Sequence, residues 1–126
     1  MIYRNPLKRL YHASIYSISG LAYALKNEQA FRYEFVVFCV LCIILCLVPI
    51  DLINSLFFAA MWFIVMALEL VNSAAEKAFD LIDKNFRPEI KAGKDMLSAA
   101  IFIMICFNIF SWLIYIFFFI NNYFAI

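Results

Sequence analysis

The sequence predicts an all-α membrane protein, built from an amphipathic N-terminal helix and three transmembrane helices. Two observations lead to this fold class. Hydrophobic residues make up 67% of the 126 positions and charged residues 15%, with a mean hydropathy of +0.92, whereas soluble domains are about half apolar and about a quarter charged. Three long stretches also carry no charged side chain, at residues 35–50, 52–68 and 96–126. The length of the chain indicates a single domain over residues 1–126.

Residues 1–28 are expected to form a helix that lies along the membrane surface. On a helical wheel their large apolar side chains gather in a sector of about 100°, which is typical of a helix with one apolar face. Basic residues stand near the start of this segment, as they do in helices that bind the interface of a bilayer. The apolar face consists of Leu7, Leu10, Tyr11, Ile18, Leu21 and Leu25.

Three transmembrane helices are predicted at about residues 32–48, 52–70 and 96–120. The first two uncharged stretches, of 16 and 17 residues, fall slightly short of the roughly 20 residues that a spanning helix needs, so each helix is expected to extend at its charged end. The turn Pro49-Ile50-Asp51 is short enough to force the first two spans into an antiparallel hairpin. Proline suits the end of a helix, and Asp51 suits the cap of the next one.

Basic residues predict the orientation of the chain in the membrane. They precede the first span or lie between the second and third spans, and neither the Pro49 turn nor the C-terminus contains one. The positive-inside rule therefore places the N-terminus and the second loop in the cytoplasm and the C-terminus outside. The net charge of +1 gives no support for nucleic-acid binding. The basic residues are Arg4, Lys8, Arg9, Lys26 and Arg32, then Lys77, Lys84, Arg87, Lys91 and Lys94.

A stripe of polar side chains continues the second predicted span. Glu69, Asn72, Glu76, Asp80 and Asp83 fall within a sector of about 80° on one helix. Such a stripe would be costly against lipid, so it is expected to face a bundle interior, water or a partner. Because three helices enclose little interior, we expect a closed, symmetric homo-oligomer to cover it.

Two further polar clusters are predicted at the same depth, at residues 27–34 and 91–95. Carboxylate oxygens suit Mg²⁺, which is commonly held by one or two carboxylates together with substrate phosphates. Basic side chains neutralise phosphate, and a remaining carboxylate can accept a proton from an attacking hydroxyl. These parts are those of phosphoryl transfer. The chain has only two glycines, so it has no glycine-rich phosphate loop. In the alternative interpretation, these charged residues only cap helices at the membrane interface.

The three clusters resemble the small integral-membrane diacylglycerol kinases of bacteria. The likeness runs through nearly the whole chain, with a basic amphipathic start, three spans and loops of matching length. Three motifs carry it, in the right order and at matching separations: Asn27-Glu28-x-Ala30-Phe31-Arg32-x-Glu34, Glu69-x-x-Asn72-Ser73-Ala74-x-Glu76-x-x-x-Asp80 and Lys94-Asp95-Met96-x-Ser98-Ala99-Ala100.

The resemblance implies a homotrimer in the bacterial inner membrane, with composite sites shared between subunits. It implies that Glu69 is the catalytic base, that Asn72 orients the reacting groups, and that Glu28 and Glu76 hold Mg²⁺ bound with ATP. Nucleotide contacts are expected at Arg9, Tyr16, Glu28, Glu76, Lys94 and Asp95. Contacts to the lipid substrate are expected at Arg9, Glu34, Glu69 and Ser98.

The implied reaction converts diacylglycerol and ATP into phosphatidic acid and ADP. A related branch of the family phosphorylates undecaprenol, and residues 94–100 look closer to the diacylglycerol branch. Two non-enzymatic hypotheses compete with a lipid kinase. One is a membrane assembly protein whose acidic stripe only holds subunits together, and the other is an oligomer whose carboxylates line a cation pore.

Overall fold

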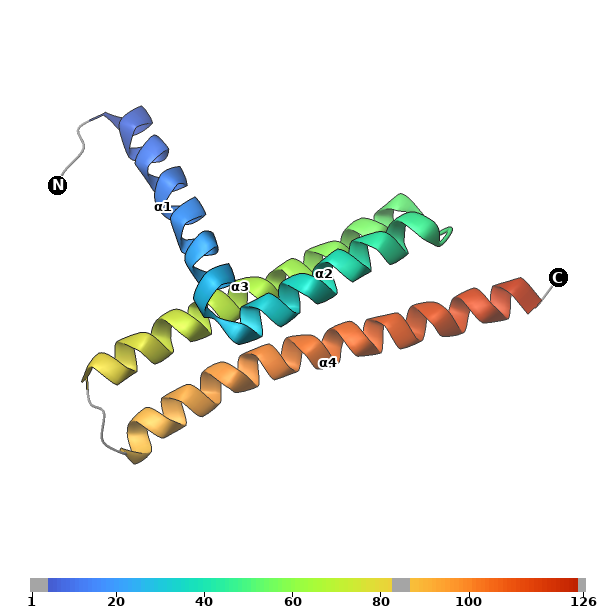
Figure 1. The fold of residues 1–126 in the computed structure, drawn as a ribbon. Helices are drawn as coiled ribbons and strands as arrows, with labels where there is room; N and C mark the ends of the chain where they lie inside the picture. The colour runs from blue at the N-terminus through green and yellow to red at the C-terminus, as the bar shows by residue number, and fades with distance from the viewer. Residues whose placement is uncertain (1–4, 83–86, 125–126) are drawn as a thin grey trace.

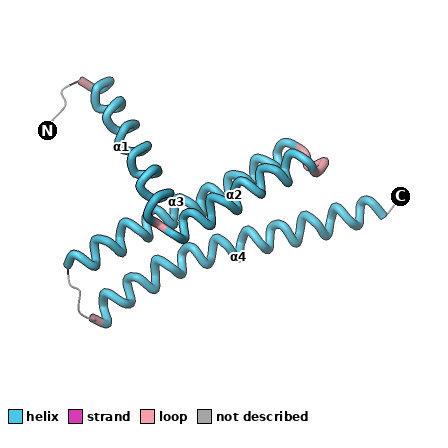
Figure 2. Tube along the Cα trace, in the orientation of Figure 1, coloured by secondary structure: helices cyan, strands magenta, loops and turns pink. Residues whose placement is uncertain are grey.

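The computed structural model describes residues 5–82 and 87–124, which form four helices (Figures 1 and 2). Helix α1 spans Pro6–Asn27, α2 Gln29–Leu47, α3 Leu52–Ile82 and α4 Pro88–Phe124. By length and composition, α2, α3 and α4 are each able to cross a bilayer. The predicted fold class, an N-terminal helix followed by three membrane helices, is therefore confirmed.

Local sequence explains where α1 and α3 begin. The backbone N–H of Leu7 donates a hydrogen bond of 3.0 Å to the side chain of Asn5, with Pro6 in the first helical turn. At the start of α3, the N–H of Asn54 donates to Asp51 Oδ1 at 3.1 Å. Asp51 thus caps α3 as expected, and the hairpin turn lies directly before it.

Helix α3 is the centre of the molecule. It packs against both α2 and α4, whereas α1 contacts mainly α2. In Figure 1, α2 and α3 form a hairpin and α4 runs along it, with the hairpin turn and the C-terminus at one end. The start of α2, the end of α3 and the start of α4 lie at the opposite end. This arrangement agrees with three antiparallel spans, and which end faces the cytoplasm stays a prediction.

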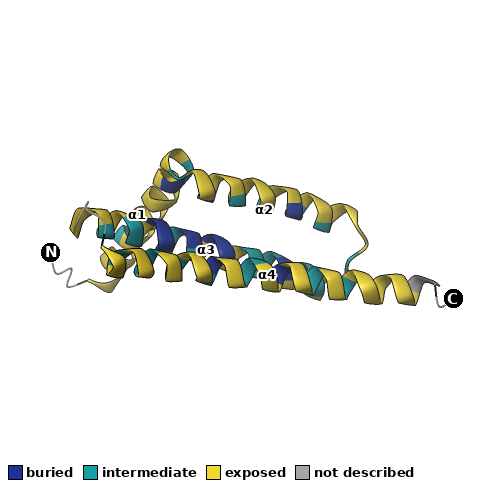
Figure 3. Ribbon diagram, turned by 90° about the horizontal axis from the view of Figure 1, so that it is seen from below, coloured by how far each residue is buried: buried dark blue, intermediate teal, exposed yellow. Residues whose placement is uncertain are grey.

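Two apolar contacts hold these helices together. Near the start of α2, the buried side chains of Ala24, Phe31 and Met66 join α1, α2 and α3. At the other end, Phe58 of α3 stacks on Trp112 of α4, with ring centroids 4.0 Å apart. Most of the remaining apolar surface is exposed (Figure 3), as expected of helices that face lipid or other subunits.

Helices α3 and α4 extend beyond the predicted spans. Helix α3 continues from the predicted end at 70 to Ile82, and α4 begins at Pro88 instead of 96. No proline or glycine interrupts residues 70–82, so the polar stripe continues the same helix. The residues of the stripe from Asn72 onward therefore stand on a helical extension of α3. The edges of the bilayer and the single-domain boundaries stay predictions.

Candidate active site at one end of the bundle

Glu28 is the single non-helical residue between α1 and α2. Its φ of −102° and ψ of 114° are those of extended backbone. Its N–H still donates to the carbonyl of Ala24 at 2.8 Å, and its carbonyl accepts from the N–H of Arg32 at 3.2 Å. The chain therefore turns without leaving a backbone group of Glu28 unpaired. Its side chain lies toward α3, where Lys77 Nζ is 2.6 Å from Oε1.

The first residues of the polar stripe of α3 are buried, whereas Glu76 is half-buried and Asp80 is exposed. Glu69 is 6% exposed, and Asn72 and Ser73 are also buried. The Ser73 hydroxyl, one turn further along α3, donates a hydrogen bond to the Glu69 carboxylate. The expectation that the stripe faces the interior of the bundle is confirmed for Glu69 and Asn72, whereas Asp83 lies outside the described residues.

Three other carboxylates lie within electrostatic reach of Glu69. The charge of Glu69 acts on Glu34 of α2, and Glu69 itself lies within the fields of Glu28 and Glu76. Two oxygens in this region, Glu34 Oε2 and Asn72 Oδ1, are buried and accept no hydrogen bond from the described residues. This end of the bundle therefore gathers negative charge and unpaired oxygen acceptors, which favours the binding of cations.

This donor set fits Mg²⁺ only when a substrate completes it. In residues 5–82 and 87–124, no three metal-ligating side chains converge on one point. Mg²⁺ commonly takes one or two carboxylates, several waters and the phosphate oxygens of a substrate. Carboxylates such as Glu28 and Glu76 supply the hard oxygen ligands that this mode requires.

A cavity of about 530 Å³ lies between α1 and α3, beside these carboxylates. Glu28 and Lys77 line it together with Ser17, Tyr23 and Ser73. The cavity joins the turn at Glu28 to the polar stripe of α3, so a ligand held there would contact both.

A second group of charges joins α3 to α4. Lys94 Nζ of α4 lies 2.6 Å from Asp80 Oδ1 of α3. Lys91 pairs with Asp95 within α4, on the exposed surface. The predicted nucleotide contacts Lys94 and Asp95 are therefore each held by an oppositely charged partner in this state.

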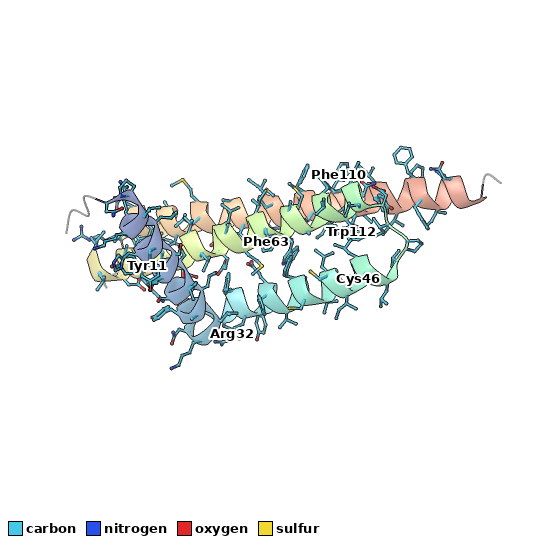
Figure 4. The ribbon with its side chains drawn as sticks, turned by 90° about the horizontal axis from the view of Figure 1, so that it is seen from above. Tyr11, Arg32, Cys46, Phe63, Phe110 and Trp112 are labelled. Carbon is cyan, nitrogen blue, oxygen red and sulfur yellow. The ribbon has the colours of Figure 1, made fainter. Side chains whose placement is uncertain are left out.

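Other predicted site residues lie apart from the four carboxylates. Arg9 and Tyr16 are exposed on α1. Figure 1 shows α1 leaving the other helices as it runs toward the N-terminus, and in Figure 4, seen from above, it crosses in front of them. Ser98 and Asp95 are exposed on α4. One subunit thus brings Glu28, Glu34 and Glu76 around Glu69. Among the described residues, no ion pair joins Arg9 or Lys94 to these four carboxylates.

The structure also adds two residues that the motifs did not single out. Trp62 Nε1 donates to the backbone carbonyl of Glu34 at 2.9 Å and ties α3 to α2. Lys77 holds Glu28, as described above. Its place beside the polar stripe, directly after Glu76, was the signal in the sequence that could have identified it.

Comparison with known proteins identifies the family of this chain. The sequence profile of the prokaryotic diacylglycerol kinase family matches residues 15–116. This chain belongs to that family. It is 35% identical over 106 residues to the diacylglycerol kinase of Escherichia coli K12, across 84% of this chain and 87% of that protein.

Other members of the family are similar over comparable lengths. The diacylglycerol kinase of Helicobacter pylori J99 is 37% identical over 106 residues, across 83% of this chain and 82% of the relative. That of Pseudomonas aeruginosa is 31% identical over 109 residues, across 86% and 89%. Family membership confirms the resemblance seen in the motifs and the expectation of an enzyme, a lipid kinase. Together with three candidate spans, it fits a multi-pass protein of a bacterial inner membrane.

Proposed function

We propose that this chain phosphorylates diacylglycerol to phosphatidic acid, with ATP as donor and Mg²⁺ as cofactor. The reaction takes place at the cytoplasmic face of the inner membrane, in a homotrimer whose sites are shared between subunits. The observation that carries the proposal is the buried Glu69 carboxylate, which lies in a membrane helix within reach of three further carboxylates. The names of the relatives support diacylglycerol as the substrate.

Glu69 acts as the general base in this proposal. It stands seven residues before Glu76 along α3, which places it about 10 Å deeper toward the hairpin turn. A lipid hydroxyl can reach it from the bilayer while the nucleotide arrives from the cytosol. The hydroxyl oxygen bonds to the γ-phosphorus as the bond to ADP breaks, and its proton passes to Glu69. Asn72, with its side-chain oxygen free, orients the reacting groups.

Glu28 and Glu76 hold Mg²⁺ together with the phosphates of ATP. When bound, the metal supplies positive charge to the phosphate oxygens. Arg9, Tyr16, Lys94 and Asp95 are proposed to contact the nucleotide. Because α1 leaves its own bundle, a neighbouring subunit supports such contacts better than the same chain does.

Arg9, Glu34 and Ser98 are proposed to contact the headgroup of the lipid. Glu34 meets this role most directly, because it interacts with Glu69. Undecaprenol is the alternative substrate, since it also presents a primary hydroxyl at the interface. The motif over residues 94–100 favours diacylglycerol.

A single assay tests the proposal. The purified protein in mixed micelles receives labelled ATP, Mg²⁺ and either dioleoylglycerol or undecaprenol. We expect labelled phosphatidate, and a loss of about 10²–10⁴-fold in rate for Glu69→Gln. Glu89→Gln, an exposed glutamate in the first turn of α4, is the matched control and should retain the rate.

Several outcomes would reject the proposal. Labelled undecaprenyl phosphate without phosphatidate would replace diacylglycerol with the alternative substrate. Full activity in Glu69→Gln would remove the proposed base. A folded oligomer that phosphorylates neither lipid, but passes ions into liposomes, would favour the pore hypothesis. Loss of the oligomer in Glu69→Gln would favour the assembly role.

A further inference from the structure

Lys77 is in direct contact with one of the carboxylates proposed to hold the metal. Its ammonium lies 2.6 Å from Glu28 Oε1, and the Lys77 side chain is 48% exposed against 19% for Glu28. The same ammonium lies 5.6 Å from the centre of the Tyr23 ring, a cation–π distance. Lys77 thus reaches from α3 across the cavity to α1.

Lys77 also lies within the field of the second proposed metal ligand. The ammonium contacts Glu28 directly, and Glu76 also acts on it, more weakly, through its charge. A divalent cation that bound these carboxylates would meet the ammonium as a like charge at short range. Lys77 and a divalent cation therefore compete for the carboxylate of Glu28.

The cluster needs positive charge when a nucleotide arrives. The carboxylates of Glu28, Glu34 and Glu76 each interact with that of Glu69. The triphosphate of a nucleotide would add further negative charge. A lysine carries three donors on a flexible stem of four carbons, which makes it a common partner for phosphate. Lys77 is half exposed at the edge of a cavity, so its ammonium can change partners by changing rotamer.

We propose that Lys77 is an exchangeable cation of the nucleotide site. Without nucleotide its ammonium neutralises Glu28, and with metal and nucleotide present it releases Glu28 and pairs with a phosphate of the nucleotide. This inference rests on the proposed function for the position of the metal and nucleotide. It makes Lys77 both a competitor of the free metal and a ligand of the bound nucleotide.

The two roles predict effects of opposite sign in Lys77→Met. Removing the ammonium frees Glu28, so binding of a free divalent cation becomes tighter. Removing the same ammonium deletes a phosphate contact, so binding of the nucleotide becomes weaker. If Lys77 only tied α1 to α3, its loss would weaken both or change neither.

The experiment measures binding to the full-length protein in nanodiscs, without turnover. Mn²⁺ alone is titrated and followed by electron paramagnetic resonance, and a non-hydrolysable ATP analogue with Mg²⁺ is titrated by calorimetry. For Lys77→Met we expect Mn²⁺ to bind about 3–10-fold tighter and the analogue about 10-fold weaker, the scale of one partly exposed charge contact. Lys77→Arg should keep both values within about 3-fold because the charge is kept.

Control variants keep the result interpretable. Lys26→Met removes an exposed lysine in the last turn of α1 and should leave both affinities unchanged. If Lys77→Met does not assemble, Lys77→Gln tests the same loss of charge. A variant that binds both ligands like the wild type, or both more weakly, overturns the inference on Lys77 alone. Wild-type protein that binds no nucleotide overturns the proposed function and this inference together.

Discussion

Phe31 is the side chain on which the junction of three helices depends. It is 1% exposed and packs with Ala24 of α1 and Met66 of α3. Replacing a buried phenylalanine with alanine costs about 3–5 kcal/mol in soluble cores. In a bilayer, separated helices expose the ring to acyl chains instead of water, so part of the transfer cost disappears. We therefore expect Phe31→Ala to destabilise the protein by about 2–3 kcal/mol, mostly as lost van der Waals contacts.

The effect of Phe31→Ala can be measured by titrating mixed micelles with dodecyl sulfate and following tryptophan fluorescence. The matched control is Phe102→Ala on α4, where the ring is 66% exposed and the expected loss is below about 0.5 kcal/mol. Because Phe31 is three residues after Glu28, the same variant should raise the KM for ATP. Equal stability of the two variants would refute the role of Phe31 as the junction of α1, α2 and α3.

Three further outcomes follow from single contacts. Trp62→Phe keeps an aromatic side chain, although a smaller one, and deletes the hydrogen bond to α2. It should cost at least about 1 kcal/mol in the same titration, and wild-type stability would contradict this. Gly93→Leu should cost about 1–3 kcal/mol by overpacking, because even a Cβ added at this position would lie 3.1 Å from the Phe79 ring. An unchanged midpoint would show that the Phe79 ring moves aside at no cost. The side-chain hydrogen bond from Asn54 lowers the pKa of Asp51 below its usual 3.8, so its stabilising effect is present above that pH and is lost as the pH falls through the lowered pKa. Asp51→Ala should therefore be less stable than the wild type at pH 7. The difference in stability between the two proteins should shrink as the pH falls below about 3.8, and a difference that stays constant with pH would contradict this.

Features that repeat along one helix could be predicted from the sequence. The three spans follow from composition, because long uncharged stretches are stable only where water is absent. The inward face of Glu69 and Asn72 follows from spacing alone, since residues three apart share a face of a helix and polar groups avoid lipid. The capping of α3 by Asp51 follows from its position two residues after Pro49, at the end of the turn.

Contacts between helices could not be predicted in the same way. The sequence marks Lys77 only as a basic residue near the cytoplasm, because its pairing with Glu28 depends on the angle at which α1 meets α2. The hydrogen bond from Trp62 to Glu34 depends likewise on the register of α2 against α3. Spacing along a chain determines the face of a residue on its own helix, but the partner on another helix depends on how both helices pack.

The distribution of charge within one subunit gives an independent reason to expect shared sites. Four carboxylates gather at the end of the hairpin, and Lys77 is the cation in contact with Glu28. Lys94 is already paired with Asp80, while Lys8 and Arg9 stand exposed on the part of α1 that runs away from the bundle. A phosphorylated nucleotide needs basic groups around it as well as metal ligands, and one subunit places most of them apart. A neighbouring copy that lays the start of its α1 beside this cluster would supply the missing positive charge, which is why we expect activity to require the intact oligomer.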